Sequence, residues 1–227
     1  DHRDLHLSIR RQRQMCIRDR SRPIHYIGTD PNTDNSIPDL GITRYEYLAD
    51  FYLRSIGEKG NGISSKFFDT KEFHTYEVFQ DGSETIQFNP IFQKYKGKLD
   101  FIFTSPPYFN REMYSDDETQ SYKAYGDYAD WRDNFLRPTL ETAVSYLKND
   151  RYLCWNIANI KVSTTKTIHL EEDSINILKS LGMEYKGKMC MIMAKMIGNS
   201  DPERLANKVL YQDTWWKHEP IFVFYKP

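Results

Sequence analysis

Short apolar runs that end in polar turns alternate along this chain with longer stretches whose apolar residues recur every three or four positions. The first pattern is typical of buried strands and the second of amphipathic helices. The expected strands cover residues 23–32 (including a polar turn at the end), 75–79, 99–103, 151–157, 183–193 and 219–225. The expected helices cover residues 43–56, 131–147 and 171–181, and residues 86–95 are expected to form a short helix or an irregular bridge. Strands and helices alternate and a hairpin follows, so the pattern predicts an α/β protein with a mostly parallel sheet and one antiparallel strand near the C-terminus.

Two of the expected helices carry local signals of their own. Thr43 and Glu46 fit a capping box, and Gly57 is placed to end the helix that they begin. Within residues 131–147, Pro138 has no backbone N–H to donate. We therefore expect Pro138 either to start a second helical segment or to kink a single helix.

Composition narrows the class of protein without identifying it. The 227 residues suit one large domain, and 16 Tyr and 13 Phe can fill a substantial core. No apolar run approaches the roughly 20 residues of a membrane span, and no secretory signal is visible, so we expect a cytoplasmic protein. The cysteines Cys16, Cys154 and Cys190 are far apart, which favours neither a disulfide framework nor a metal site, and Cys154 is expected to be a buried apolar residue. The formal net charge of −1 gives no support of its own to nucleic-acid binding.

Residues 1–20 look foreign to the rest of the chain. Gln14 to Arg20 resembles one translated frame of a transposon end that is used to prepare sequencing libraries. We therefore expect residues 1–20 to be a non-native artefact and residues 21–227 to be the native domain. The alternative is a natural basic arm.

The most informative stretch follows the expected strand at 99–103 and reads Thr104-Ser105-Pro106-Pro107-Tyr108. Two consecutive prolines give up two backbone N–H groups and fix φ near −65°, so the strand cannot continue through them. The tip presents carbonyl oxygens, a Ser hydroxyl and an aromatic ring. This set suits a flat ligand with an amino group, because oxygens accept its N–H bonds and the ring stacks on its face. The alternative is a proline-rich turn with no further role.

This stretch resembles the catalytic motif of the S-adenosylmethionine-dependent DNA amino methyltransferases, in which Asp, Asn or Ser precedes Pro-Pro and an aromatic residue. The form with Ser at position 105 is most similar to the N4-cytosine enzymes. The resemblance covers residues 23–227 and implies a Rossmann-like class I methyltransferase sheet. It makes Ser105, Pro106, Pro107 and Tyr108 the catalytic residues and requires no metal.

The resemblance also implies where the cofactor, S-adenosylmethionine, would bind. Asp30, followed by Pro31 and Asn32, would hold the ribose at the end of the strand at 23–32. The expected adenine contacts are Asp81 and Ser83, and Thr104 also belongs to the cofactor site. Asp30 and Asp81 could instead be simple turn residues. The family's Gly-rich loop, Phe-x-Gly-x-Gly, does not occur in this sequence, so we expect the chain to be truncated at its N-terminal side.

The implied reaction is methyl transfer to the exocyclic amine of a base flipped out of DNA, with N4 of cytosine favoured over N6 of adenine. DNA is the expected partner, and a restriction endonuclease is a candidate second partner in a bacterial or phage context. Two rival functions stay open. One is methylation of RNA or of a protein glutamine, and the other is a non-catalytic nucleic-acid-binding remnant.

Further candidate residues lie beyond this motif. Residues 109–129 are expected to form a flap near the substrate base, with Arg111 as a phosphate contact, or else a solvated acidic loop. Asn156 and Asn159 end the strand at 151–157, on the side where ligands bind to such sheets. Residues 196–217 are expected to be a polar insertion, and His218-Glu219 resembles the last strand of the family.

Overall fold

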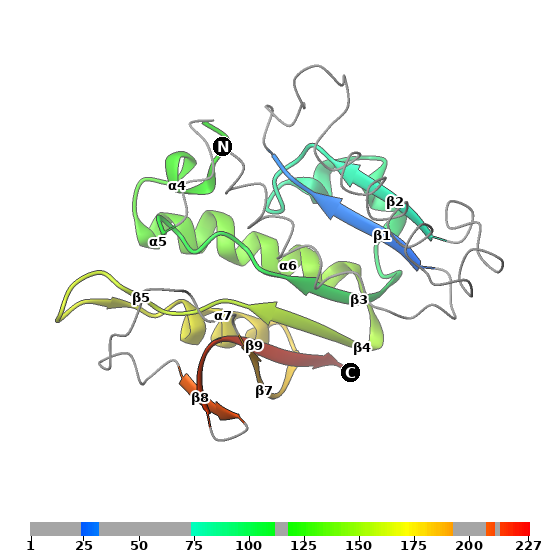
Figure 1. Cartoon of the computed structure of the whole chain (residues 1–227). Coiled ribbons are helices and arrows are strands. Elements are labelled where there is room, and N and C mark those ends of the chain that lie inside the picture. Colours follow the sequence, from blue (N-terminus) through cyan, green and yellow to red (C-terminus); the bar gives the residue numbers. More distant parts are fainter. Residues whose placement is uncertain (1–23, 32–73, 112–117, 193–207, 212–213) are drawn as a thin grey trace, which may run out of the picture. The chain divides into compact units, whose positions relative to one another are not determined.

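The computed structural model describes residues 24–31, 74–111, 118–192, 208–211 and 214–227 (Figure 1). The chain divides into two compact units, residues 1–82 and 83–227. No helix in the described ranges is long and apolar enough to cross a membrane. The expected boundary at residue 20 and the expected helix at 43–56 lie outside the described residues.

The described part of the first unit is a pair of parallel strands, β1 (Ile24–Thr29) and β2 (His74–Phe79). Thr29 lies opposite Phe79, and the backbone N–H of Asp30 donates to the Phe79 carbonyl at 3.0 Å. Both strands confirm the sequence prediction. Since they run in parallel, the polar residues that follow them emerge at the same edge of the sheet.

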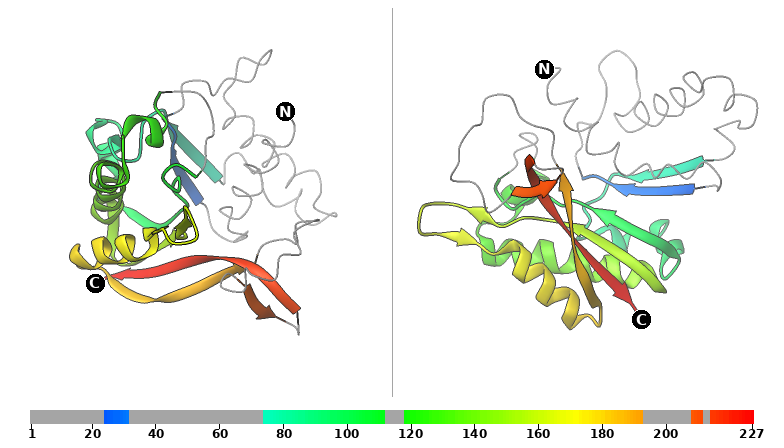
Figure 2. Two further views of the ribbon diagram at one scale, coloured as in Figure 1. Left: turned by 90° about the vertical axis from the view of Figure 1, so that its left-hand side faces the viewer. Right: turned by 60° about the horizontal axis from the view of Figure 1, so that its bottom comes forward.

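The second unit is built on a five-stranded sheet in the order β3-β4-β9-β7, with β8 paired to β9. Its strands are β3 (Leu99–Thr104), β4 (Leu147–Asn156), β7 (Glu184–Ile192), β8 (Lys208–Tyr211) and β9 (Thr214–Lys226). β3 and β4 are parallel, whereas β9 runs antiparallel to β4, to β7 and to β8. Figure 2 shows β7 and β9 as one long twisted ribbon. The expected reversal of direction near the C-terminus is therefore the strand β9.

Helical segments of the second unit connect these strands. They are the 3-10 turns η1 (Ile86–Phe88) and η2 (Phe92–Tyr95), the helices α4 (Ser121–Ala124), α5 (Tyr128–Trp131), α6 (Arg137–Tyr146) and α7 (Leu170–Ser180), and the π-helical turn η3 (Arg132–Leu136). The segments α5, η3 and α6 follow one another without a break, and Pro138 is the second residue of α6, which begins directly after the π-helical turn η3. The hydrogen-bond pattern of the helix thus changes next to Pro138, while the helical dihedral angles continue through Leu136 and Arg137.

The core of the second unit lies between the sheet and the helices α6 and α7. Leu140 from α6, Leu178 from α7 and Trp155 from β4 are fully buried in one cluster. The indole N–H of Trp155 donates to the Ser174 hydroxyl at 3.2 Å, and this hydroxyl donates to the Leu170 carbonyl at 2.7 Å. The polar atoms that this packing buries are thus paired, as a stable core requires.

Two stretches that the sequence left without assigned elements contain short ones. The stretch 109–129 contains α4 and the beginning of α5, and the stretch 196–217 contains β8 and the beginning of β9. β8 forms by pairing with β9. Because this strand depends on its partner, its own short sequence carries only a weak signal for it. A short hairpin, β5 (Ile160–Lys161) and β6 (Thr167–Ile168), was also not predicted.

Candidate active site

The strand β3 delivers the Ser-Pro-Pro-Tyr tip to the carboxyl edge of the second unit's sheet. Thr104 is the last residue of β3 and lies opposite Trp155 of β4. The next side chain is Ser105, whose Oγ is buried and has no hydrogen-bond partner among the residues that the structure describes. A buried hydroxyl without a partner is uncommon and calls for an explanation, since it has lost its bonds to water. Its position directly before the two prolines makes Ser105 the centre of the candidate site.

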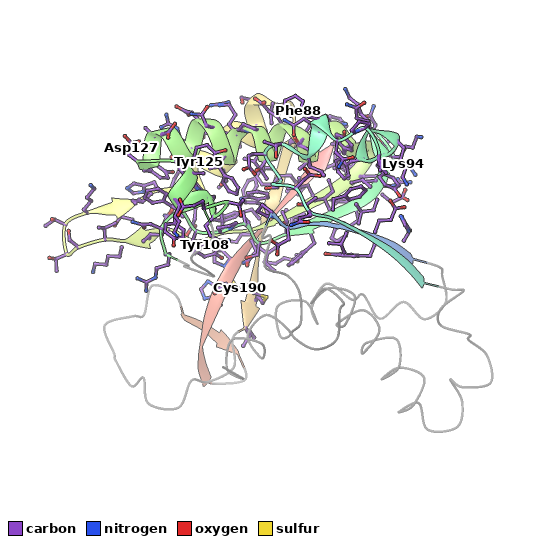
Figure 3. All side chains as sticks on the ribbon, turned by 90° about the horizontal axis from the view of Figure 1, so that it is seen from above. Phe88, Lys94, Tyr108, Tyr125, Asp127 and Cys190 are labelled. Carbon is purple, nitrogen blue, oxygen red and sulfur yellow. The ribbon has the colours of Figure 1, made fainter. Side chains whose placement is uncertain are left out.

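Tyr108, the last residue of the tip (Figure 3), is packed into the interior of the second unit. Its ring is buried, with 7% of its surface exposed, and its hydroxyl donates to Oδ1 of Asn156 at 3.4 Å. The amide nitrogen of Asn156 donates to the Pro220 carbonyl on β9 at 2.8 Å. A carbonyl accepts and does not donate, so this bond fixes which way the Asn156 amide points, and Oδ1 therefore faces the phenol. Stacking of the Tyr108 ring on a base stays a prediction.

Phe109 anchors the tip from its other end. Its φ of 46° lies in the left-handed region, and its ring is 8% exposed. The ring meets Tyr128 and Trp131 edge-on, with centroids 5.7 and 5.8 Å apart. Such edge-to-face pairs stabilise beyond the area that they bury, which can offset the backbone strain. Phe109 thus belongs to the core cluster, and Tyr128, from the other end of the expected flap, packs against it.

Four of the six predicted cofactor residues belong to the first unit. Asp30 follows β1 directly and Asp81 follows β2 after one intervening residue, so both carboxylates emerge at the same edge of the parallel pair. Both side chains are partly buried. Carboxylates at such an edge can accept hydrogen bonds from sugar hydroxyls or from an amino group. Pro31 lies beside Asp30, and Asn32 falls outside the described residues.

The other two predicted cofactor residues lie on the second unit. The hydroxyl of Ser83 is 3.0 Å from the hydroxyl of Thr139 on α6, so it already has one partner. Thr104 is partly buried at the end of β3. The structure therefore separates the predicted cofactor residues into two groups, one on each unit.

Glu84 is a buried ionisable residue of the second unit that the sequence did not reveal. The phenol of Tyr125 donates to its Oε1 at 3.4 Å, while its Oε2 is buried without a partner. Burial raises the pKa of the Glu84 carboxyl above its usual 4.5, and burial together with this carboxylate raises the pKa of Tyr125 to about 12. Glu84 follows an Asp-Gly-Ser turn, which is a context that predicts an exposed side chain.

The remaining predicted residues differ in their surroundings. The backbone N–H of Asn159 donates to Glu171, and the backbone N–H of Glu171 donates to the Asn159 side chain at 2.9 Å, so Asn159 holds the beginning of α7. Arg111 is exposed, next to the tip. Cys154 is buried, and burial raises the pKa of its thiol, which fits the expected apolar role. His218 has a buried Nδ1 without a partner, in the first half of β9.

Comparison with known proteins identifies the family. The model of a family described as DNA methylase matches residues 99–227, which is more than half of the chain and includes β3, the tip and every later strand. A search of curated proteins finds no match.

Several solved structures are similar. A protein from Thermus thermophilus, described as a candidate DNA modification methylase, is 15% identical with a TM-score of 0.42, over 65% of this chain and 52% of that one. The same protein complexed with S-adenosyl-L-methionine is 13% identical with a TM-score of 0.41, over 64% and 53%. A SAM-dependent methyltransferase from Archaeoglobus fulgidus is 14% identical with a TM-score of 0.42, over 98% and 94%.

The chain thus spans about half the length of the Thermus protein, and similarity at this level does not establish an activity. The family match is of a different kind, because it covers most of the second unit and contains the Ser-Pro-Pro-Tyr tip. On that match, the chain belongs to the DNA methylase family.

Proposed function

We propose that this protein is an S-adenosylmethionine-dependent DNA methyltransferase that methylates an exocyclic amino group, with N4 of cytosine favoured over N6 of adenine. The observation that carries the proposal is the Ser105 hydroxyl, which is buried, has no partner, and directly precedes Pro106 and Pro107. A substrate amine in contact with this oxygen would supply the missing hydrogen bond. Membership of the DNA methylase family supports the same class of substrate.

Ser105 and Pro106 would act on the amine by accepting its two N–H bonds. The lone pair of an exocyclic amine is delocalised into the base, so the nitrogen is a poor nucleophile. Hydrogen bonds to Ser105 Oγ and to the Pro106 carbonyl favour a pyramidal nitrogen and direct its lone pair away from the ring. The same oxygens stabilise the positive charge that develops on nitrogen as the new N–C bond forms.

Pro107 and Tyr108 would keep these acceptors in place. Pro107 fixes the backbone of the tip, and Tyr108 is held through Asn156 to β9. A rigid acceptor pair costs no reorganisation at the moment of reaction, which is the main advantage of a preorganised site. A base cannot reach the tip from inside a duplex, so we infer that the target nucleotide is flipped out.

The hydrogen-bond acceptors of the first unit suit S-adenosylmethionine. Asp30 and Asp81 offer carboxylates at one edge of a parallel strand pair, where they could accept from the ribose hydroxyls and from the adenine amine. When bound, this cofactor supplies an electrophilic methyl group. The task of the first unit's carboxylates would be to hold the cofactor, and the task of the tip would be to hold the base.

The test is to express the complete genomic form of the gene that encodes this sequence in a host free of DNA methylation. The host DNA is then digested to nucleosides and analysed by mass spectrometry, with an empty vector as control. N4-methylcytosine is the expected product. N6-methyladenine would keep the reaction and overturn the preference for cytosine, whereas methylation of RNA or protein alone, or of nothing, would overturn the proposed function.

A further inference from the structure

The hairpin β5–β6 lies at the same end of the sheet as the Ser-Pro-Pro-Tyr tip. β4 runs parallel to β3 and ends at Asn156, and β5 begins four residues later at Ile160. Ile160 and Ile168 lie opposite each other in the hairpin, and both are buried in the core. In Figures 1 and 3 the hairpin extends beyond the carboxyl ends of β3 and β4, past Tyr108. The hairpin is thus anchored at its base and projects from the catalytic edge.

The projecting part is exposed and cationic. All residues from Lys161 to Thr167 are exposed, and residues 157–169 contain two lysines, one histidine and no acidic residue. In the described parts of the chain, neither Lys161 nor Lys166 makes an ion pair or a side-chain hydrogen bond. Ser163 Oγ accepts from the backbone N–H groups of Thr165 and Lys166 at 3.3 and 3.1 Å. The loop between the lysines therefore has a defined conformation.

In the part of the chain that the structure describes, some other lysines of the same unit make ion pairs, unlike Lys161 and Lys166. Lys148 contacts Asp100 at 2.7 Å, and Lys186 contacts Glu184 at 2.5 Å. The acidic residues nearest to the hairpin in sequence, at the beginning of α7, interact with other groups. Glu171 and Glu172 accept from Asn159, and Asp173 accepts from Tyr128. His169 lies 3.5 Å from Glu172, whereas no ion pair among the described residues involves Lys161 or Lys166.

We propose that the β5–β6 hairpin binds the phosphate backbone of the DNA beside the target base, through Lys161 and Lys166. This inference rests on the proposed function, because it takes DNA as the substrate of the tip. Phosphate contacts position a protein on a duplex without reading its sequence, and flexible ammonium groups suit this role. With a net charge of −1 for the whole chain, DNA binding needs a local basic element at the catalytic edge, and the hairpin provides one.

The test measures binding of the full chain to a short fluorescent DNA duplex by anisotropy, over a series of salt concentrations. The hairpin variant is Lys161→Ala, Lys166→Ala. Its matched control is Lys96→Ala, Lys98→Ala, which removes two exposed lysines at the opposite, amino-terminal end of β3. A charge-preserving variant, Lys161→Arg, Lys166→Arg, completes the set, and thermal unfolding checks that each protein is folded.

Each phosphate contact contributes about 0.9 to the slope of log K against log salt, so loss of two contacts should lower its magnitude by about 1.8. At roughly 0.1 M salt this corresponds to about 60-fold weaker binding. The arginine variant should bind like the wild type, and the Lys96, Lys98 control should change far less.

Two results would overturn the inference. If the hairpin variant binds as well as the wild type, or no worse than the Lys96, Lys98 control, the hairpin is not the contact and the proposed function stands. If the wild-type chain does not bind duplex DNA at all, the inference falls together with DNA as the substrate.

Discussion

Replacement of Ser105 by alanine should raise the stability of the protein and abolish most of its activity. The Ser105 hydroxyl is buried without a partner, and such a group costs about 1–3 kcal/mol of folding free energy. Alanine removes that cost. The void left by a hydroxyl of roughly 12 Å³ costs only about 0.3 kcal/mol at about 24 cal/mol per Å³. We therefore expect Ser105→Ala to raise the free energy of unfolding by about 1 kcal/mol and Tm by roughly 3 °C.

The effect on activity should have the opposite sign. If Ser105 Oγ accepts one of the two N–H bonds of the target amine, its removal resembles the loss of one preorganised hydrogen bond to a transition state. Such losses lower kcat by about 10²–10³-fold. The effect should appear in kcat more than in KM, because the bond strengthens as charge develops on nitrogen.

The assay combines urea unfolding with methyl incorporation into DNA, and Ser174→Ala is the matched control. Ser174 is a fully buried serine whose hydroxyl, unlike that of the partly buried Ser105, accepts from Trp155 and donates to Leu170. Its loss leaves a buried indole N–H unpaired, so Ser174→Ala should lower the free energy of unfolding by about 1–3 kcal/mol and leave kcat unchanged. If Ser105→Ala destabilises the protein as Ser174→Ala does, or methylates at the wild-type rate, the reasoning about Ser105 is refuted.

Three further predictions follow from the site. Tyr108→Phe and Asn156→Ala should each destabilise the protein, and a double-mutant cycle by urea unfolding should give a coupling of about 0.5–1.5 kcal/mol; additive effects would mean that the two side chains do not interact. Burial raises the pKa of Glu84 above 4.5, so the folded chain binds this proton more tightly than the unfolded chain and loses stability as pH rises above 4.5. Glu84→Gln removes this loss, so its advantage over the wild type in urea unfolding should grow with pH, and a constant difference would contradict the assignment. Asp30→Ala should weaken S-adenosylmethionine binding by about tenfold or more in calorimetry, and unchanged affinity would remove Asp30 from the cofactor site.

The sequence predicted those parts of the fold that depend on local patterns. The apolar runs at 75–79, 99–103 and 183–193 became β2, β3 and β7, because a short apolar run bounded by polar turns has few other stable states. The helix α7 was predicted at 171–181 and is observed as Leu170–Ser180, with Gly182 beyond its end. The Ser-Pro-Pro-Tyr tip was also visible, since proline acts on the backbone that carries it.

The parts that sequence reasoning missed depend on partners far away in the chain. Tyr108 meets an amide that lies 48 residues later, and that amide is fixed by a carbonyl 64 residues further on. Tyr125 and Glu84 are 41 residues apart, and nothing around either residue indicates that they meet. Phe109 was assigned to a loop because polar and acidic residues follow it, yet its own ring is held by the aromatic residues of α5. In each case tertiary packing, which has no local period, decided the outcome.

The two prolines of the tip separate side chains with opposite roles. After them, Tyr108 and Phe109 are buried among partners, one hydrogen-bonded to Asn156 and the other packed on α5. Before them, Ser105 is buried but has no partner. A flexible backbone could move until the Ser105 hydroxyl found a hydrogen-bond partner. The anchored rings of Tyr108 and Phe109 and the fixed φ of the two prolines restrict this movement. The energy stored in the unpaired hydroxyl is therefore released only when a ligand brings donors to it, which is the condition for a preorganised acceptor.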